Sequence, residues 1–207
     1  MSISAKVTQR IQRMKRGVPF AINRFYELGS ETAVQKALSR LAEEGVISRV
    51  AKGIYVRPKS LPSLPSITLK PSAVTIAQVW AKEHNYTLVS QGMEAAYRLG
   101  FQTQAPVKTI FWSDGPSRRF VVGKEVVEVR HIARGKLRWN DRPEGELLRG
   151  LSVTSASEVE LPVLHNAFKR LGLTKHDCQA VVQRLKASSL PKAWQQKLSE
   201  LETRMSV

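Results

Sequence analysis

Apolar residues recur every three or four positions in two stretches near the start of the chain, residues 4–14 and 31–44. This period predicts two amphipathic helices. In the second stretch, Val34, Leu38 and Leu41 form the expected buried seam, with Ala37 beside it. Between the two, Asn23 is a suitable N-cap for a short helix that ends at Gly29. Three helices are therefore expected before residue 45.

A tight hairpin is predicted directly after the third helix. Two β-rich runs at 46–50 and 54–56 flank Ala51-Lys52-Gly53, and Gly53 can adopt the positive φ that such a turn requires. Three helices followed by a hairpin is the order of a winged helix-turn-helix, in which the third helix enters the major groove and the hairpin is the wing. The residues expected to seat the hairpin on the helices are Val46, Ile47, Val50, Ile54 and Val56.

Residues 58–71 contain four prolines and three serines. This composition is typical of a semi-extended connector and predicts a domain boundary. The expected organisation is a winged helix-turn-helix domain at 1–58, a linker at 59–71 and a second domain at 72–207.

The second domain mixes helical and β-rich patterns. Helical pattern is expected at 75–83 and 92–99, and Gly123-Lys124 is a candidate tight turn between two strands. The β-rich runs are 86–89, 107–112, 119–122 and 125–132, and the later helical pieces are 144–151, 158–171, 175–187 and 191–204. The predicted fold class is α+β, with an N-terminal winged helix-turn-helix, a mixed α+β domain and a helical C-terminal part.

The charge balance changes this picture from a generic fold to a candidate function. The chain has 33 Lys and Arg against 17 Asp and Glu, a net charge of +16 and a pI near 10.4. Residues 1–60 hold 12 bases and 4 acids, 61–140 hold 11 and 5, and 141–207 hold 10 and 8. Such a surplus attracts polyanions, most often nucleic acid, so this binding is expected in the first two-thirds of the chain.

Cysteine content and hydropathy bear on the compartment. The single cysteine excludes an intramolecular disulfide and fits a reducing cytoplasm. The first residues have no apolar leader, and no run reaches the ~18 apolar residues of a membrane span. We therefore expect a soluble cytoplasmic protein with no membrane partner.

Two groups of polar residues are candidates for DNA contact. On the hairpin, Lys52 lies at the turn, with Arg49 and Arg57 on the flanking strands, where cations can neutralise phosphates. The alternatives are protection of an edge strand for the hairpin cations and a solvated face for the polar residues of the third helix. The residues on the polar face of the third helix, which can bond base edges or phosphates, are Thr32, Gln35, Lys36, Ser39 and Arg40.

The run SETAVQKALSRLAEEGVISRVAKGIYVRPK resembles the N-terminal winged helix of AbiEi-family antitoxins, bacterial transcriptional regulators of the type IV toxin-antitoxin class. The resemblance implies a repressor that binds double-stranded DNA repeats in its own promoter. It also implies that the second domain counteracts a co-encoded nucleotidyltransferase-like toxin. On this pattern the helix-face residues above match the recognition helix, and Arg49, Lys52 and Tyr55 match the wing. The alternative is a DNA-binding factor of a mobile element or phage-defence system without an antitoxin role.

A second basic cluster follows in the next hundred residues. It could extend the DNA footprint or bind an acidic toxin surface, or it could be a solvated hairpin face, because strand alternation scatters neighbours over both sides of a sheet. Its members are Arg118, Arg119, Lys124, Arg130, Arg134, Lys136 and Arg138.

Enzymatic chemistry has one weak candidate. Asp114 followed by Glu128-Val129-Arg130 is similar to the Asp…Glu-x-Lys arrangement with which nucleases hold Mg²⁺. Arg stands where Lys is expected, and Arg cannot release its proton to act as a base. The four histidines have no partner at ligand spacing, and Cys178 lies on an expected helix as a small core residue. A Mg²⁺-dependent nuclease is thus the third interpretation, and we predict no catalytic residue, metal or cofactor.

Overall fold

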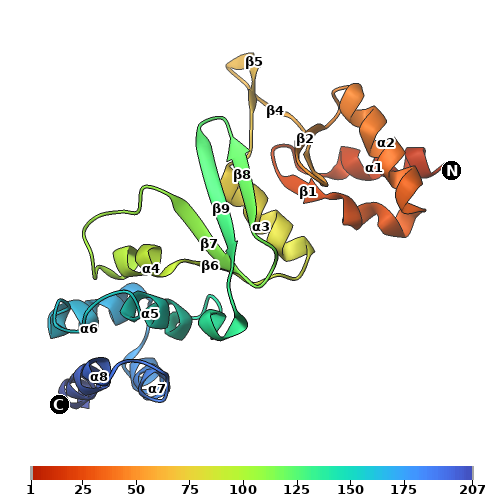
Figure 1. Ribbon diagram of the computed structural model, residues 1–207. Coiled ribbons are helices and arrows are strands. Elements are labelled where there is room, and N and C mark those ends of the chain that lie inside the picture. The colour runs from red at the N-terminus through yellow and green to blue at the C-terminus, as the bar shows by residue number, and fades with distance from the viewer. Residues whose placement is uncertain (1, 207) are drawn as a thin grey trace. The chain divides into compact units, whose positions relative to one another are not determined.

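The computed structural model describes residues 2–206, and its chain forms two compact units (Figure 1). Unit 1 comprises Met1–Tyr86 and Arg118–Val127, and unit 2 comprises Thr87–Ser117 and Glu128–Val207. The predicted α+β class with a helical C-terminal part is confirmed.

In its described residues, unit 1 contains four helical segments, a three-stranded sheet and two further hairpins. Its elements are α1 (Ile3–Arg13), β1 (Pro19–Ala21), η1 (Ile22–Leu28), α2 (Glu31–Glu43), β2 (Ser48–Ala51), β3 (Ile54–Val56), β4 (Lys59–Leu61), β5 (Leu64–Leu69), α3 (Ala73–Glu83), β8 (Arg118–Val122) and the first half of β9 (Glu125–His131).

The predicted helices at 4–14 and 31–44 are confirmed as α1 and α2. Each begins at a serine whose Oγ accepts a backbone N–H: Ser2 from Ala5 at 3.2 Å and Ser30 from Ala33 at 3.4 Å. Their apolar stripes meet in one core with the sheet. The fully or nearly buried members of this core are Val7, Ile11, Phe20, Phe25, Val34, Ala37, Leu38, Leu41, Ile47 and Tyr55.

The short segment between α1 and α2 differs from its prediction. It is a 3₁₀ helix, η1, whose N-cap is Ala21. The expected cap, Asn23, instead donates its Nδ2 hydrogen to the carbonyl of Glu83 at 2.9 Å. A tertiary partner sixty residues away therefore takes the side chain that local sequence would assign to capping.

The predicted hairpin is confirmed as β2 and β3, joined by Lys52 and Gly53. Gly53 has φ +75°, as its turn position requires. The sheet order is β1-β3-β2, with both pairs antiparallel. Ile47 and Ile54 seat the hairpin, whereas Val46 is 37% exposed, so its predicted burial is wrong.

The stretch predicted to be a semi-extended connector forms an antiparallel hairpin. Lys59 of β4 pairs with Leu69 of β5, and the register shifts between Ser60 and Leu61. Pro58 and Pro71 lie just outside the two strands, where the missing amide hydrogen interrupts no ladder. Of the other two prolines, Pro62 lies in the turn and Pro65 within β5, so a proline-rich sequence here forms a hairpin and not an open chain.

Helix α3 and the β8–β9 hairpin complete unit 1. The Trp80 ring packs at 5.7 Å from the ring of Phe120, and the Arg118 guanidinium lies 5.3 Å from the Trp80 centroid. The Glu125 carboxylate accepts the backbone N–H of Ala73, the first residue of α3, at 2.9 Å. The predicted turn at Gly123 is confirmed, with φ +60°.

In its described residues, unit 2 combines a few short strands with five α-helices and one 3₁₀ helix. Its strands are β6, β7 and the second half of β9, which belong to the four-stranded hydrogen-bonded order β6-β7-β9-β8, and β6 is antiparallel to β7. Its elements are β6 (Leu88–Ser90), α4 (Gly92–Leu99), β7 (Thr109–Ser113), the rest of β9, η2 (Arg134–Leu137), α5 (Pro143–Leu151), α6 (Leu161–Arg170), α7 (Lys175–Lys186) and α8 (Lys192–Ser206).

The core of unit 2 is built by its helices around Trp194 and Phe168. Cys178 is 6% exposed within this core, which confirms its prediction as a small core residue. Burial, more than the nearby charge of Asp177, raises the pKa of its thiol.

Helices α4 and α5 approach each other through small residues. A Cβ on Gly92 would lie 2.6 Å from Cγ1 of Val153 and 2.9 Å from the Arg149 carbonyl. A Cβ on Gly150 would lie 2.7 Å from Cδ1 of Leu99. Glycine at these two positions is what lets the helix backbones pack this closely.

Arg149 is buried on α5, and this burial lowers its pKa to about 10. Its Nη1 donates to the carbonyl of Asn140 at 2.7 Å. Trp139 and Asn140 both have positive φ, +63° and +48°. The buried guanidinium thus stabilises a turn with positive φ, a conformation that residues other than glycine rarely adopt.

Within residues 2–206, no helix is both long enough and apolar enough to span a bilayer.

Candidate nucleic-acid interface

Helix α2 divides cleanly into a buried face and an exposed face. Val34, Ala37, Leu38 and Leu41 face the core of unit 1, as predicted. The five predicted contact residues are all exposed: Thr32, Gln35, Lys36, Ser39 and Arg40. The packing that fixes the orientation of α2 therefore presents these side chains to solvent as a group.

The start of α2 is held close to α1. A Cβ on Gly29 would lie only 2.4 Å from Cδ1 of Ile3, so the turn before α2 requires a residue without a side chain. The φ of Gly29 is 164°, which is ordinary extended backbone, so close approach and not strain explains the glycine. This contact fixes where the N-terminal turn of α2, with Thr32, begins.

The β2–β3 hairpin presents two exposed cations, Arg49 on β2 and Lys52 at the turn. Its tip is anchored, because the carbonyl of Gly53 accepts the backbone N–H of Ile22 at 2.9 Å. The backbone of Lys52 is therefore held in place, and its exposed side chain can contact a polyanion.

The other two predicted hairpin contacts have structural roles. Tyr55 is 6% exposed and stacks on Phe20, with ring centroids 6.3 Å apart. Nη1 of Arg57 donates to the carbonyls of Gln12 at 2.7 Å and Met14 at 2.9 Å, at the end of α1. Both side chains are thus occupied within unit 1.

Four cations of this surface have no carboxylate partner among the residues that the structure describes: Lys36, Arg40, Arg49 and Lys52. Elsewhere in unit 1, Arg10 pairs with Glu27 and Arg24 lies 3.9 Å from Glu83. We call the exposed face of α2 together with Arg49 and Lys52 the basic face of unit 1.

A groove of about 380 Å³ borders this face, and the sequence did not predict it. It lies among β2, β5 and β8 and is lined by apolar Val50, Val56 and Leu69 together with two cations, Arg49 and Lys70. Lys70 had no local signal, because its position beside β2 depends on the β4–β5 hairpin.

A further basic run at the end of α1 was also missed. Arg13, Lys15 and Arg16 are exposed, and Nη1 of Arg16 donates to the carbonyl of Pro58 at 3.3 Å. The run RMKRG was visible in the sequence, and its proximity to the end of β3 follows from the hydrogen bonds of Arg57.

The second basic cluster does not belong to one unit. Arg118, Arg119 and Lys124 lie in unit 1, and the remaining four members lie in unit 2. Several are already engaged: Arg130 with Glu128 at 2.8 Å, Arg134 with Asp114 at 3.6 Å, and Arg138 over the Trp139 ring at 4.4 Å. Among the described residues, Arg119, Lys124 and Lys136 remain exposed without an ion pair.

The carboxylates of the nuclease interpretation have different partners. Asp114 accepts the backbone N–H of Thr87 at 2.7 Å and faces Arg134, whereas Glu128 pairs with Arg130. Across the part of the chain that is described, no three His, Cys, Asp or Glu side chains are grouped as metal ligands. His84 and His131 each bond a backbone carbonyl through Nδ1, at 2.8 and 3.0 Å.

Comparison with known proteins places the chain in a family. No curated protein matches it. Among solved structures, the crystal structure of the RV2827C protein from Mycobacterium tuberculosis is similar at 16% identity and a TM-score of 0.38, covering 96% of this chain and 82% of that chain, a likeness too low to carry an argument. One family model, described as a family of unknown function (DUF6088), matches residues 6–160. Because this match spans most of the chain, the protein belongs to the DUF6088 family.

Proposed function

We propose that this protein is a sequence-specific DNA-binding repressor whose residues 1–58 act as a winged helix-turn-helix. The observation that carries the proposal is the basic face of unit 1, whose cations on α2 and on the β2–β3 hairpin have no carboxylate partner among residues 2–206. Unit 1 holds 17 Lys and Arg against 6 Asp and Glu, which favours a polyanionic partner.

The proposed mechanism assigns different tasks to the two elements. Helix α2 enters the major groove, where Gln35, Lys36 and Arg40 can bond base edges. Arg49 and Lys52 then neutralise phosphates beside the groove and fix the register of the protein on the duplex. Tyr55 and Arg57 support the hairpin from within and make no DNA contact.

In this proposal the protein is cytoplasmic and represses its own promoter. The resemblance of residues 30–59 to AbiEi-family winged helices supports this role and extends it to an antitoxin that counteracts a co-encoded nucleotidyltransferase-like toxin. DNA binding is the primary proposal, because the basic face of unit 1 supports it. The antitoxin role is secondary, because it rests on the resemblance alone.

A salt series tests DNA binding. Fluorescence anisotropy is measured on the DNA just upstream of the protein's own reading frame and on a scrambled duplex. Each lost phosphate contact should flatten the log-log salt dependence by about 0.9, so Arg49→Ala and Lys52→Ala should each do so without changing sequence preference. Gln35→Ala or Lys36→Ala should instead cost ~1 to 3 kcal/mol on the specific duplex only.

The matched control is Lys192→Ala, an exposed cation of unit 2 that should leave every curve unchanged. If the parent protein binds both duplexes equally at all salt concentrations, specific repression is excluded. If the hairpin variants behave like the parent, the assignment of β2–β3 as the wing is wrong.

Co-expression tests the antitoxin role. A nucleotidyltransferase-like protein encoded by a neighbouring reading frame should arrest bacterial growth when it is expressed alone. Growth should be restored when this chain is co-expressed with it. Growth arrest that persists in the presence of the full chain would favour a DNA-binding factor of a mobile element or phage-defence system.

A further inference from the structure

A cavity of about 530 Å³ lies within unit 2, where the start of α7 meets one face of α6 and the end of α8. Cavities of this size commonly hold small organic molecules. It shares no residue with the basic face of unit 1, and the proposed repressor mechanism makes no use of it.

The floor of the cavity is apolar. Leu201 of α8 is 2% exposed and Cys178 of α7 is 6% exposed, and Leu161 and Leu173 border them. A hydrocarbon chain bound here would move from water to an apolar surface, which the hydrophobic effect favours. Its binding would break no hydrogen bond between polar groups of the floor.

The rim of the cavity is cationic. Lys169 of α6, Lys175 of α7 and Arg204 of α8 are all exposed, and no Asp or Glu lines the cavity within the described part of the chain. None of the three forms an ion pair with a described residue. Three helices thus each contribute one unopposed positive charge to the same opening.

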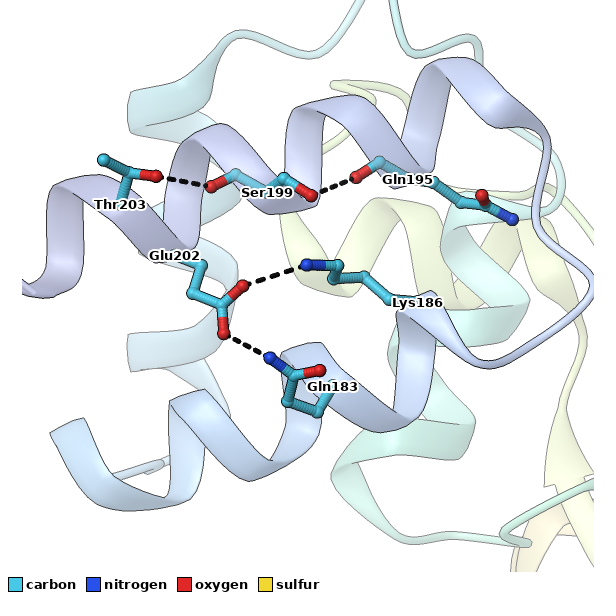
Figure 2. Close-up of polar contacts among 6 residues, drawn as sticks. All are labelled: Gln183, Lys186, Gln195, Ser199, Glu202 and Thr203. Atoms are coloured by element: carbon cyan, nitrogen blue, oxygen red, sulfur yellow. Dashed lines mark hydrogen bonds and ion pairs between the residues drawn. The ribbon is translucent and has the colours of Figure 1, made fainter.

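Four acids lie close in sequence to residues of the cavity, and none of them lines it. Glu160 and Glu200 are exposed outside the cavity, and Glu202 and Asp177 have partners elsewhere. Glu202 of α8 accepts hydrogen bonds from Lys186, at 3.0 Å, and from Gln183, both on α7 (Figure 2). Residues two apart on a helix point to nearly opposite sides, because each residue turns the helix by about 100°. The Glu202 carboxylate therefore does not neutralise the charge of Arg204. Asp177 accepts from the backbone N–H and the hydroxyl of Thr174 in the capping box of α7.

We propose that this cavity binds a small amphipathic anion, a monocarboxylate with a medium-length hydrocarbon chain. The chain lies on the floor formed by Leu161, Leu201 and Cys178. The carboxylate lies among the rim cations, where charge-assisted hydrogen bonds hold it. A purely polar anion would leave the apolar floor unused, and a neutral hydrocarbon would leave the three cations unused.

Calorimetry with the full chain tests this binding. The probes are decanoate, the neutral alcohol 1-decanol, and acetate, which keeps the carboxylate without the chain. We expect decanoate to bind with one-to-one stoichiometry and at least about tenfold more tightly than decanol, and acetate to give no binding heat. The double variant Lys175→Gln/Arg204→Gln should weaken decanoate binding about tenfold or more, whereas Lys192→Gln should not.

The single cysteine supplies a second readout at the cavity itself. Decanoate should slow alkylation of Cys178 by a maleimide in the parent protein and do so less in the double variant. Both substituted side chains are exposed, so circular dichroism should show the same thermal unfolding as the parent. The proposal is overturned if decanoate and decanol bind equally, if the rim variant matches the parent, or if bound decanoate leaves the alkylation rate unchanged.

Discussion

At the scale of single residues, cations that look equivalent in the sequence have different tasks. Arg49 and Arg57 flank the same turn, yet Arg49 is exposed whereas Arg57 bonds two carbonyls at the end of α1. These carbonyls lie at the C-terminal end of α1, where no N–H of a following helical turn is available to bond them. Arg57 therefore joins α1 to β3.

The two arginines should separate in a stability measurement. Arg57→Ala removes hydrogen bonds from a charged donor and should lower the free energy of unfolding by about 1.5 to 3 kcal/mol. Arg49→Ala should change it by less than about 0.5 kcal/mol. Urea unfolding followed by circular dichroism measures both, and equal effects would contradict the separate roles.

Glycines of unit 2 allow an equally direct comparison. Gly92→Ala forces a Cβ to within 2.9 Å of a backbone carbonyl and should destabilise the protein by about 1 to 3 kcal/mol. Gly135→Ala meets no atom within 4 Å and serves as the control. Thermal unfolding of the two variants should therefore differ, and a tolerated Gly92→Ala would mean that α4 and α5 do not pack this closely.

At the scale of elements, α7 and α8 are joined by a polar contact as well as by the core. Hydrogen bonding by Lys186, and secondarily by Gln183, lowers the pKa of Glu202. A carboxyl whose pKa is lower in the folded state stabilises that state above its unfolded pKa, and this contribution is lost as the pH falls through the folded value.

The pH dependence should disappear with the carboxylate. Glu202→Gln should lower the free energy of unfolding by up to about 1 kcal/mol at pH 7, and the difference from the parent should vanish as Glu202 is protonated in acid. Chemical unfolding between pH 7 and pH 3 measures this difference. Glu200→Gln, an exposed neighbour on α8, is the control, and a difference that persists at pH 3 would exclude the charge as its cause.

At the scale of the whole molecule, the division of the chain does not follow the order of the sequence. Unit 1 includes α3, and the chain returns to it at β8 after the segment Thr87–Ser117 of unit 2. Helix α3 packs against β1, and its last residue, Glu83, accepts the hydrogen bond from Asn23 and faces Arg24. A domain that ended at the predicted linker would lack α3, and β1 would lose its packing against that helix.

Fragments can test that boundary. A fragment of residues 1–71 exposes the apolar side chains of β1 that α3 covers, so it should unfold at a lower temperature than a fragment of residues 1–86. Circular dichroism melting compares the two. Equal melting temperatures would favour the boundary expected from proline content.

The sequence by itself determined the regular elements of this protein. Helical periodicity located α1 and α2 and identified the seam of α2, because a helix must bury one stripe whatever it packs against. The turn at Gly53 was predictable for the same kind of reason, since positive φ is a local requirement. The exposed face of α2 followed from its buried face.

Only the tertiary structure decided which side chains remain free to bind something. Arg57, Tyr55 and Asn23 were assigned to DNA contact or capping by their neighbours in sequence, and each has a partner more than thirty residues away. The cavity of unit 2 was invisible for the same reason, since its floor and rim come from three helices. Periodicity reports which face of an element is apolar, but the partner of a polar side chain is set by long-range packing that no local pattern contains.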